Sequence, residues 1–308
     1  MGWLRSLRFW LHTRQEEEFD SGRNLILVRC LDSTKMDRDP NMNAKVSRIG
    51  SHRAIGWVGS VLCCLATTLA AQEGSGPRPA ARIDHALFDG LLRAYVNDDG
   101  MVNYRAWKKS DTRTLGRYLA RLGGIKVETL SRSEKLAFWI NAYNALTLQG
   151  ILDFYPLKSI RDKVSRVGGY SIWDDYKLLV RGEDYSLNQI EHEILRKMGE
   201  PRIHLAIVCA SIGCPRLLAE AYTSEKLEEQ LHRNGVDFFS RAQNFRKDKK
   251  TVRLSSILKW FGEDFGGTDA AKLAFAAEHV TDSALAAQLT GGGIKVKYLA
   301  YDWSLNEQ

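Results

Sequence analysis

Cys209 is the side chain best placed in this sequence to do chemistry. It follows the segment 202–208, RIHLAIV, in which branched apolar residues alternate with other residues. This period-two pattern predicts a buried strand. Gly213 and Pro215 then favour a loop. We expect a cysteine at such a strand end to face a cleft, because open sheets keep their ligand sites at strand ends.

Three interpretations of Cys209 are open. In the first, Cys209 is a nucleophile, His192 is its base, and Glu191 or an asparagine orients the base. This arrangement lets a thiolate attack an acyl carbon while the imidazole is held in one tautomer. Backbone N–H groups of the turn 210–213, together with Asn144, are candidate oxyanion donors.

The other two interpretations involve the second cysteine, Cys214. Cys209 and Cys214 could form a disulfide, which an exported setting favours. Alternatively, zinc could bind both thiols together with His192 and His204. Zinc is the weakest interpretation, because the two cysteines are spaced more widely than in the usual paired knuckle.

Glu191 and His192 lie on a helix predicted over 186–199. Ser186 and Gln189 have the spacing of a capping box. The apolar stripe of this helix consists of Leu187, Ile190, Ile194 and Met198. Glu191 falls inside the stripe, so its carboxylate needs a partner or a raised pKa. His192 lies at the edge, where a lone histidine is more often a satisfied core residue than a catalytic base.

Two asparagines lie on the strongest predicted helix. It opens with a capping box at Ser131 and Glu134 and stops before Pro156, which disfavours helix at the preceding residue. Asn141 and Asn144 are three residues apart on one face of this nearly all-apolar helix. Because buried amides are costly unless hydrogen-bonded, the two side chains either hold the backbone of a neighbouring loop or line a site.

The other segments alternate between helix and strand signals. Helices are predicted near 83–96, 115–122, 221–240, 268–280 and 282–290, and strands near 101–109, 176–180, 251–254 and within 291–308. This order is typical of a single α+β domain in which helices pack around a small sheet.

The composition is that of an ordinary globular protein. The 308 residues are 44% hydrophobic and 26% charged, with a formal net charge of +7. An excess this small, spread along the chain, gives little support for a nucleic-acid partner, which would need a clustered basic face. No cofactor and no metal is predicted.

The N-terminal part looks separate from the domain. Residues 42–71 combine a basic start, an uncharged apolar run and small residues at the end, which predicts a signal peptide. Residues 1–41 are then a non-native extension, 72–81 a linker and 82–308 the domain. The predicted location is periplasmic or secreted. The alternative is an inner-membrane anchor at 54–71, which would be the only contact with a membrane.

Several motifs together resemble domain-of-unknown-function family 547. They are FWINAYNAL (138–146), SLNQIEHEILR (186–196), HLAIVCASIGCPRL (204–217) and YDWSLN (301–306). The resemblance covers most of residues 88–306 and implies an exported bacterial member with a cysteine-hydrolase-like site. It also implies that relatives in plants commonly carry serine in place of Cys214 and often lack His204. Neither a disulfide nor zinc binding through Cys214 would then be the function that the family shares, and His192 would be a better candidate base than His204.

These observations favour a thiol-dependent hydrolase or acyltransferase acting on a peptide-like or other acyl substrate. Cys209 is the expected nucleophile, His192 the base and Glu191 its orienter. The candidate binding residues are Asn141, Asn144, Ser211 and His204. The alternative is a non-catalytic ligand- or partner-binding module of the cell envelope, with a structural or redox Cys209–Cys214 pair.

Overall fold

The apolar helix predicted after Ser131 lies at the centre of the fold. In the computed structural model of the chain, which describes residues 83–164 and 169–308, it forms α5 (Arg132–Phe154). The capping box is present, with the Glu134 N–H donating to Ser131 Oγ and the Ser131 N–H donating to Glu134 Oε2. Most residues of α5 are buried. The helix is apolar nearly all round because other elements cover its faces.

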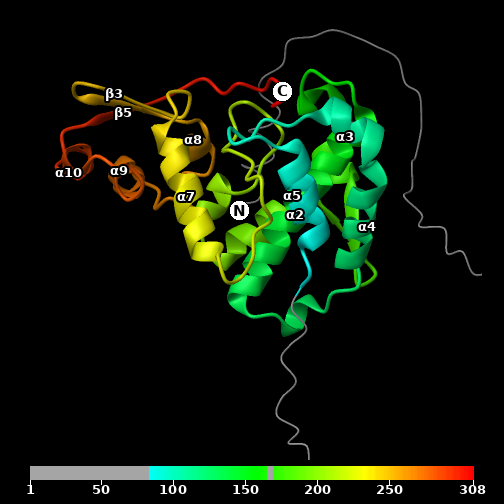
Figure 1. The fold of residues 1–308 in the computed structure, drawn as a ribbon. Helices are drawn as coiled ribbons and strands as arrows, with labels where there is room; N and C mark the ends of the chain where they lie inside the picture. Colours follow the sequence, from blue (N-terminus) through cyan, green and yellow to red (C-terminus); the bar gives the residue numbers. More distant parts are fainter. Residues whose placement is uncertain (1–82, 165–168) are drawn as a thin grey trace, which may run out of the picture. The chain divides into compact units, whose positions relative to one another are not determined.

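Three shorter helices pack around α5 (Figure 1). They are α2 (Ala86–Tyr95), α3 (Tyr104–Ser110) and α4 (Thr112–Leu122). The strand predicted near 101–109 is wrong. The Asn103 side chain accepts the Ala106 N–H at 3.0 Å and starts helix α3 instead.

Short elements connect α5 to the cysteine loop. They are η2 (Ile160–Lys163), α6 (Ile172–Asp175), β1 (Lys177–Val180) and β2 (Glu183–Ser186). One further short element, η1 (Val127–Thr129), comes before α5. The predicted strand near 176–180 is confirmed as β1, and it pairs with β2 in an antiparallel hairpin. Arg181 and Gly182 make the turn with φ values of 55° and 89°, which suits a tight hairpin.

The predicted helix over 186–199 is present in an unusual form. It is made of π-helical turns in η3 (Gln189–Leu195), followed by η4 (Arg196–Met198). The predicted capping contacts exist, because Ser186 N–H donates to Gln189 Oε1 at 3.0 Å and Gln189 N–H donates to Ser186 Oγ at 3.2 Å. Wide π-turns are rare and often lie at functional sites.

The strand predicted over 202–208 is wrong. Residues Pro201–Leu205 form the 3₁₀ helix η5, which Pro201 opens and the Glu200 side chain caps. The chain then crosses α5 without a partner strand. All residues from 203 to 208 are buried, so the apolar alternation did not mark one face of a sheet.

A second hydrophobic cluster lies beyond η5, around a three-stranded sheet. Its elements are α7 (Leu227–Ser240), β3 (Phe245–Asp248), β4 (Thr251–Leu254), α8 (Ile257–Trp260), α9 (Asp269–Ala277), α10 (Ser283–Thr290) and β5 (Lys295–Tyr298). β4 lies in the middle, antiparallel to β3 and parallel to β5. After β5 the chain returns to the first cluster, where the Asn306 side-chain amide donates to the Gly100 carbonyl (Figure 1).

The predicted α+β class is confirmed by these helices and two small sheets. Within residues 83–164 and 169–308, no helix is both long and apolar enough to span a bilayer. The predicted extension 1–41, signal peptide 42–71 and linker 72–81 lie outside the described residues.

Candidate functional site

The C-terminal tail holds the cysteine loop in place. The Ile212 N–H donates to the Ser304 carbonyl at 2.8 Å, and the Gly213 N–H donates to the Asp302 carbonyl at 2.8 Å. Ala210, directly after Cys209, is buried with φ at 55°. A non-glycine residue in this left-handed conformation costs energy and is concentrated at functional sites. The sequence motifs 204–217 and 301–306 therefore meet in space.

The two thiols of this loop touch each other. Cys209 Sγ and Cys214 Sγ are 3.0 Å apart and both cysteines are free. The hydroxyl of Tyr301 lies 3.2 Å from Cys209 Sγ and 2.9 Å from Cys214 Sγ. Ser211 Oγ is 3.7 Å from Cys209 Sγ. Cys209 is partly buried as a residue and Cys214 is fully buried, so Cys209 is the less enclosed of the two cysteines.

The surroundings of the pair favour one thiolate, on Cys214. Burial opposes its charge, but the Cys209 thiol, the Tyr301 hydroxyl and the Cys209 backbone N–H at 3.1 Å all donate to this sulfur. Together they lower the pKa of Cys214 to about 7. The pKa of Cys209 is raised, because its proton is held in the hydrogen bond to Cys214 and because it is buried next to that charge. The pair therefore releases its first proton as a unit.

Gly213 sets the distance between the tail and the thiols. A Cβ atom on Gly213 would lie 2.9 Å from both the Asp302 nitrogen and the Tyr301 ring. We expect Gly213→Ala to destabilise the protein by about 1–3 kcal/mol and to raise the pKa of the pair, because Tyr301 must move away. Chemical denaturation and thiol alkylation against pH measure both effects.

The matched control for that prediction is Gly90→Ala on α2. A Cβ atom on Gly90 would meet nothing within 4 Å. This substitution should leave stability unchanged or raise it by about 0.5–1 kcal/mol, since alanine is the better helix former. Equal losses in the two variants would contradict the role given to Gly213.

Glu191 is buried near the thiols, as the apolar stripe predicted. The Tyr143 hydroxyl donates to Glu191 Oε2 at 3.3 Å, and His204 Nδ1 lies 3.9 Å from Glu191 Oε1. Burial raises the pKa of Glu191 to about 7. The hydrogen bond from Tyr143 lowers this pKa, and the nearby negative charge of Cys214 raises it further. The carboxyl therefore has both a partner and a raised pKa.

His204 lies between Glu191 and an ion pair, and it makes its hydrogen bond to the ion pair. His204 Nε2 lies 2.7 Å from Asp264 Oδ2, and Arg196 binds both oxygens of Asp264 at 2.6 and 2.8 Å. Burial opposes the charge of Asp264, but its hydrogen bonds to Arg196 and His204 hold its pKa well below the usual range. Burial lowers the pKa of His204, so the ring, stacked 4.0 Å from Phe261, is neutral at pH 7.

His192 does not lie within hydrogen-bond reach of either thiol. Its Nδ1 is 3.0 Å from Arg196 Nη1. Burial and the neighbouring Arg196 charge lower the pKa of His192 to about 4. The Ile212 and Gly213 N–H groups donate to the tail, so they are engaged rather than free to bind an oxyanion.

Asn141 and Asn144 both hold loop backbone. Asn144 Nδ2 donates to the Ala206 carbonyl at 3.0 Å while its Oδ1 accepts the Val208 N–H at 2.9 Å. Asn141 makes the same pair of bonds to Tyr222, at 2.7 and 2.9 Å. Each amide thus replaces a missing strand partner, and Asn144 is no longer available as an oxyanion donor.

The structure offers no metal site at the thiols. Among the described residues, no three His, Cys, Asp or Glu side chains are grouped so that they could hold a metal ion. The zinc interpretation would need both thiols together with His192 and His204. Those two imidazoles contact Arg196 and Asp264 instead.

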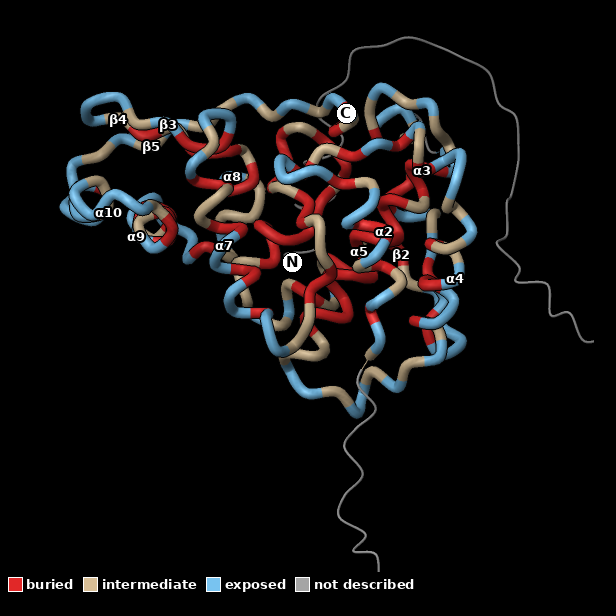
Figure 2. The backbone as a smooth tube through the Cα atoms, viewed as in Figure 1, coloured by how far each residue is buried: buried red, intermediate tan, exposed pale blue. Residues whose placement is uncertain are grey.

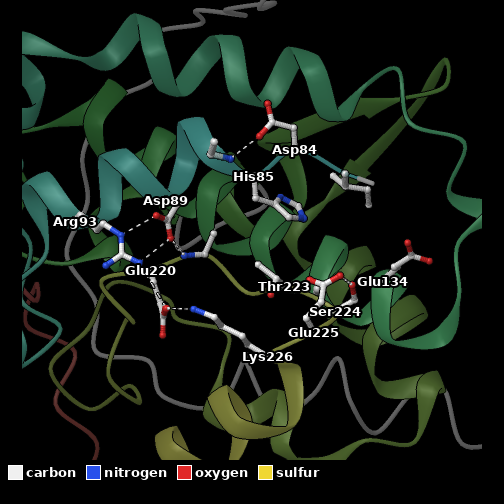
Figure 3. Close-up of a pocket in the computed structure, with 14 residues that line it drawn as sticks. Asp84, His85, Asp89, Arg93, Glu134, Glu220, Thr223, Ser224, Glu225 and Lys226 are labelled. Carbon is white, nitrogen blue, oxygen red and sulfur yellow. Dashed lines mark hydrogen bonds and ion pairs between the residues drawn. The ribbon is translucent and has the colours of Figure 1, made fainter. Parts of the chain in front are cut away.

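A separate cavity of about 480 Å³ lies between α2 and the 220–226 loop (Figure 3). Asp89 pairs with Arg93 at 2.7 Å, and Lys226 lies 3.9 Å from Glu220. Asp84 accepts the Ala86 N–H. These charges are satisfied within the wall, so the cavity is a weaker candidate than the thiol loop.

Sequence reasoning missed Tyr143, Tyr301, Arg196 and Asp264. Three of them had a signal, because Tyr143 stands in the motif 138–146, Arg196 ends the motif 186–196 and Tyr301 opens the motif 301–306. Asp264 lies in a loop with no motif, and nothing in the sequence placed it beside His204.

Part of the chain is similar to a known protein family. Residues 127–239 match the family described as "Protein of unknown function, DUF547". The matched segment contains Asn144, Glu191, His204 and both thiols, but it ends before Asp264 and Tyr301. No curated protein and no solved structure matches the chain. The match supports the domain family without describing an activity.

Proposed function

We propose that the loop 209–214 carries out thiol–disulfide exchange with a disulfide-bonded peptide or small molecule. The observation that supports this most is the contact between two free thiols, 3.0 Å apart, of which Cys209 belongs to the less buried residue. A disulfide bond is about 2.05 Å long, so a shift of about 1 Å would close it. The low pKa of Cys214 supplies a base inside the pair.

The reaction has two steps. Cys209 passes its proton to Cys214 and attacks the substrate disulfide, which gives a mixed disulfide and one substrate thiolate. That thiolate takes the proton from Cys214, and the Cys214 thiolate then attacks Cys209 Sγ and expels the second substrate sulfur as a thiolate, which takes a proton from water. The dithiol is oxidised to a disulfide and the substrate disulfide is reduced to two thiols.

Alkylation against pH tests the pair. Iodoacetamide should label Cys209 with a midpoint near pH 7, because the pair loses its first proton there and Cys209 becomes a thiolate by passing its own proton to Cys214. Cys214→Ser should move this midpoint up toward that of an ordinary thiol, about 8.5. Ser211→Ala is the control in the same loop and should move the midpoint much less, since the 3.7 Å contact of Ser211 Oγ with Cys209 Sγ is the smallest of the causes that shift the pKa of Cys209.

Oxidised glutathione tests the exchange itself. Peptide mass mapping separates Cys209 and Cys214 from Cys30, Cys63 and Cys64. The native chain should form a Cys209–Cys214 bond, and Cys214→Ser should trap a glutathione adduct on Cys209. If both thiols could still be alkylated after incubation with oxidised glutathione, the proposal would be contradicted.

A second function is supported by Glu191. A buried carboxyl with pKa about 7, which accepts a hydrogen bond from Tyr143, is a base poised near neutral pH. It favours a thiol-dependent hydrolase or acyltransferase with Cys209 as nucleophile. Cys214→Ser separates the two functions, because it stops exchange at the mixed disulfide but leaves acylation of Cys209 by an activated ester.

We also propose that the protein acts in the periplasm or outside a bacterial cell. The proposal rests on the signal-peptide pattern at 42–71. N-terminal sequencing of the expressed protein should find a start near residue 72. An intact Met1 would contradict export by cleavage.

A further inference from the structure

One row of residues across the three-stranded sheet consists only of cations. Arg246 on β3 pairs with Arg253 on β4, and Arg253 pairs with Lys297 on β5. Side chains at directly opposed positions lie about 5 Å apart at Cβ, where like charges repel each other. Such a row weakens the sheet unless an anion compensates it.

Further cations surround this row. The exposed cations of the strands and their turn are Arg246, Lys249, Lys250, Lys295 and Lys297, and Arg253 is partly exposed. Within these strands and the turn, all of which the structure describes, Asp248 is the only carboxylate. Asp248 lies 3.3 Å from Arg253 and compensates one charge.

The row faces away from the core. On β4 the side chains alternate, with Val252 and Leu254 buried and Arg253 more exposed. The buried side contributes to the same hydrophobic cluster as Leu273 of α9 and Leu289 of α10, and these two helices lie beside the sheet (Figure 2). The cations therefore form an outward basic face on an element that does not contact the thiols.

We propose that this basic face docks the protein on an anionic phospholipid bilayer. The face presents Arg and Lys side chains from adjacent strands, and lipid phosphates in a fluid layer can rearrange to meet them. Sites for single-stranded nucleic acid combine such charge with aromatic platforms. Tyr298 lies opposite Leu254, in a row whose β3 and β4 members are buried, so it does not belong to the cationic row.

Vesicle binding of the full chain tests the proposal. The probes are phosphatidylcholine vesicles with and without phosphatidylglycerol, at low and high salt. The triple variant Arg246→Gln, Lys295→Gln, Lys297→Gln removes three charges of the face. Each cation near an anionic membrane contributes roughly a fivefold factor in binding, so we expect partitioning to fall about 100-fold.

The control removes three exposed cations elsewhere, with Arg113→Gln, Lys126→Gln and Lys177→Gln. It has the same net charge as the test variant and should bind nearly as well as the native chain. Both variants keep residues 1–82, so any contribution from that segment is the same. The test variant should also be at least as stable as the native chain, because repulsion within the row is relieved.

Three outcomes would overturn the proposal. The native chain could fail to prefer phosphatidylglycerol vesicles at low salt. The control variant could lose as much binding as the test variant, which would leave net charge as the cause. A single- or double-stranded oligonucleotide could bind the face more tightly than vesicles at the same salt, which would make nucleic acid the partner.

Discussion

Replacing Asn144 by alanine should destabilise the protein by about 2–6 kcal/mol and disturb the thiol loop. The amide is buried and makes two bonds to backbone, one to Ala206 and one to Val208. Alanine leaves both backbone groups without a partner. Each buried, unsatisfied group costs about 1–3 kcal/mol. The loss is large because no neighbouring strand can replace the amide.

The effect on chemistry follows from position. Val208 directly precedes Cys209, and its N–H donates to Asn144 Oδ1. The N–H of Cys209 itself donates to Cys214 Sγ at 3.1 Å. If the backbone at Val208 shifts, this donor leaves the thiolate. We therefore expect Asn144→Ala to raise the pH midpoint of Cys209 alkylation as well as to lower stability.

Asn141→Ala is the matched control. It removes the same two kinds of bond from the same helix, but at Tyr222 rather than beside Cys209. Urea denaturation should show a similar loss of stability in the two variants. Under native conditions only Asn144→Ala should change the alkylation midpoint. A midpoint that moves equally in both variants would show that stability alone controls the thiols.

The sequence predicted best those features that depend on neighbours along one helix. Capping-box spacing located the starts of the helices at Ser131 and Ser186. Helical periodicity placed Asn141 and Asn144 in the core and Glu191 on a buried stripe. Burial of a polar group then implied its need for a partner, and the structure supplies these partners.

Features that depend on distant contacts were not predictable in the same way. The segment 203–208 has the composition of a strand, but it is buried on every side and α5 supplies its partner through Asn144. Tyr301 reaches the thiols only because the tail returns past the sheet. The distance from His192 to the thiols depends on how η3 packs, and adjacency to Glu191 in sequence carries no information about it.

Replacing Glu191 by glutamine should make stability less sensitive to pH. Burial raises the pKa of Glu191 from its ordinary value of 4.5 to about 7. Between these values the folded protein binds more protons than the unfolded chain, so stability falls as pH rises. The ionised carboxylate then costs the native chain roughly 3 kcal/mol above pH 7, since each pKa unit corresponds to about 1.36 kcal/mol.

Glutamine has nearly the same shape and cannot ionise. Its carbonyl oxygen can still accept the hydrogen bond of Tyr143, which Glu191 Oε2 accepts at 3.3 Å. The native chain and Glu191→Gln should therefore be close in stability near pH 4.5. The variant should become increasingly the more stable of the two as pH rises from 4.5 to 7, with a constant difference above that, and urea denaturation from pH 4.5 to pH 8 measures the difference.

Two further variants identify the cause. Glu193→Gln removes an exposed carboxylate two residues away and should leave the pH dependence unchanged. Cys214→Ser removes the neighbouring negative charge, so the midpoint of the Glu191 transition should move down but stay above 4.5, because burial is the larger cause. If the native chain and Glu191→Gln lost stability in parallel from pH 5 to pH 8, Glu191 would already be ionised in the folded protein. It could then not serve as a base near neutral pH, and the hydrolase alternative would lose its support.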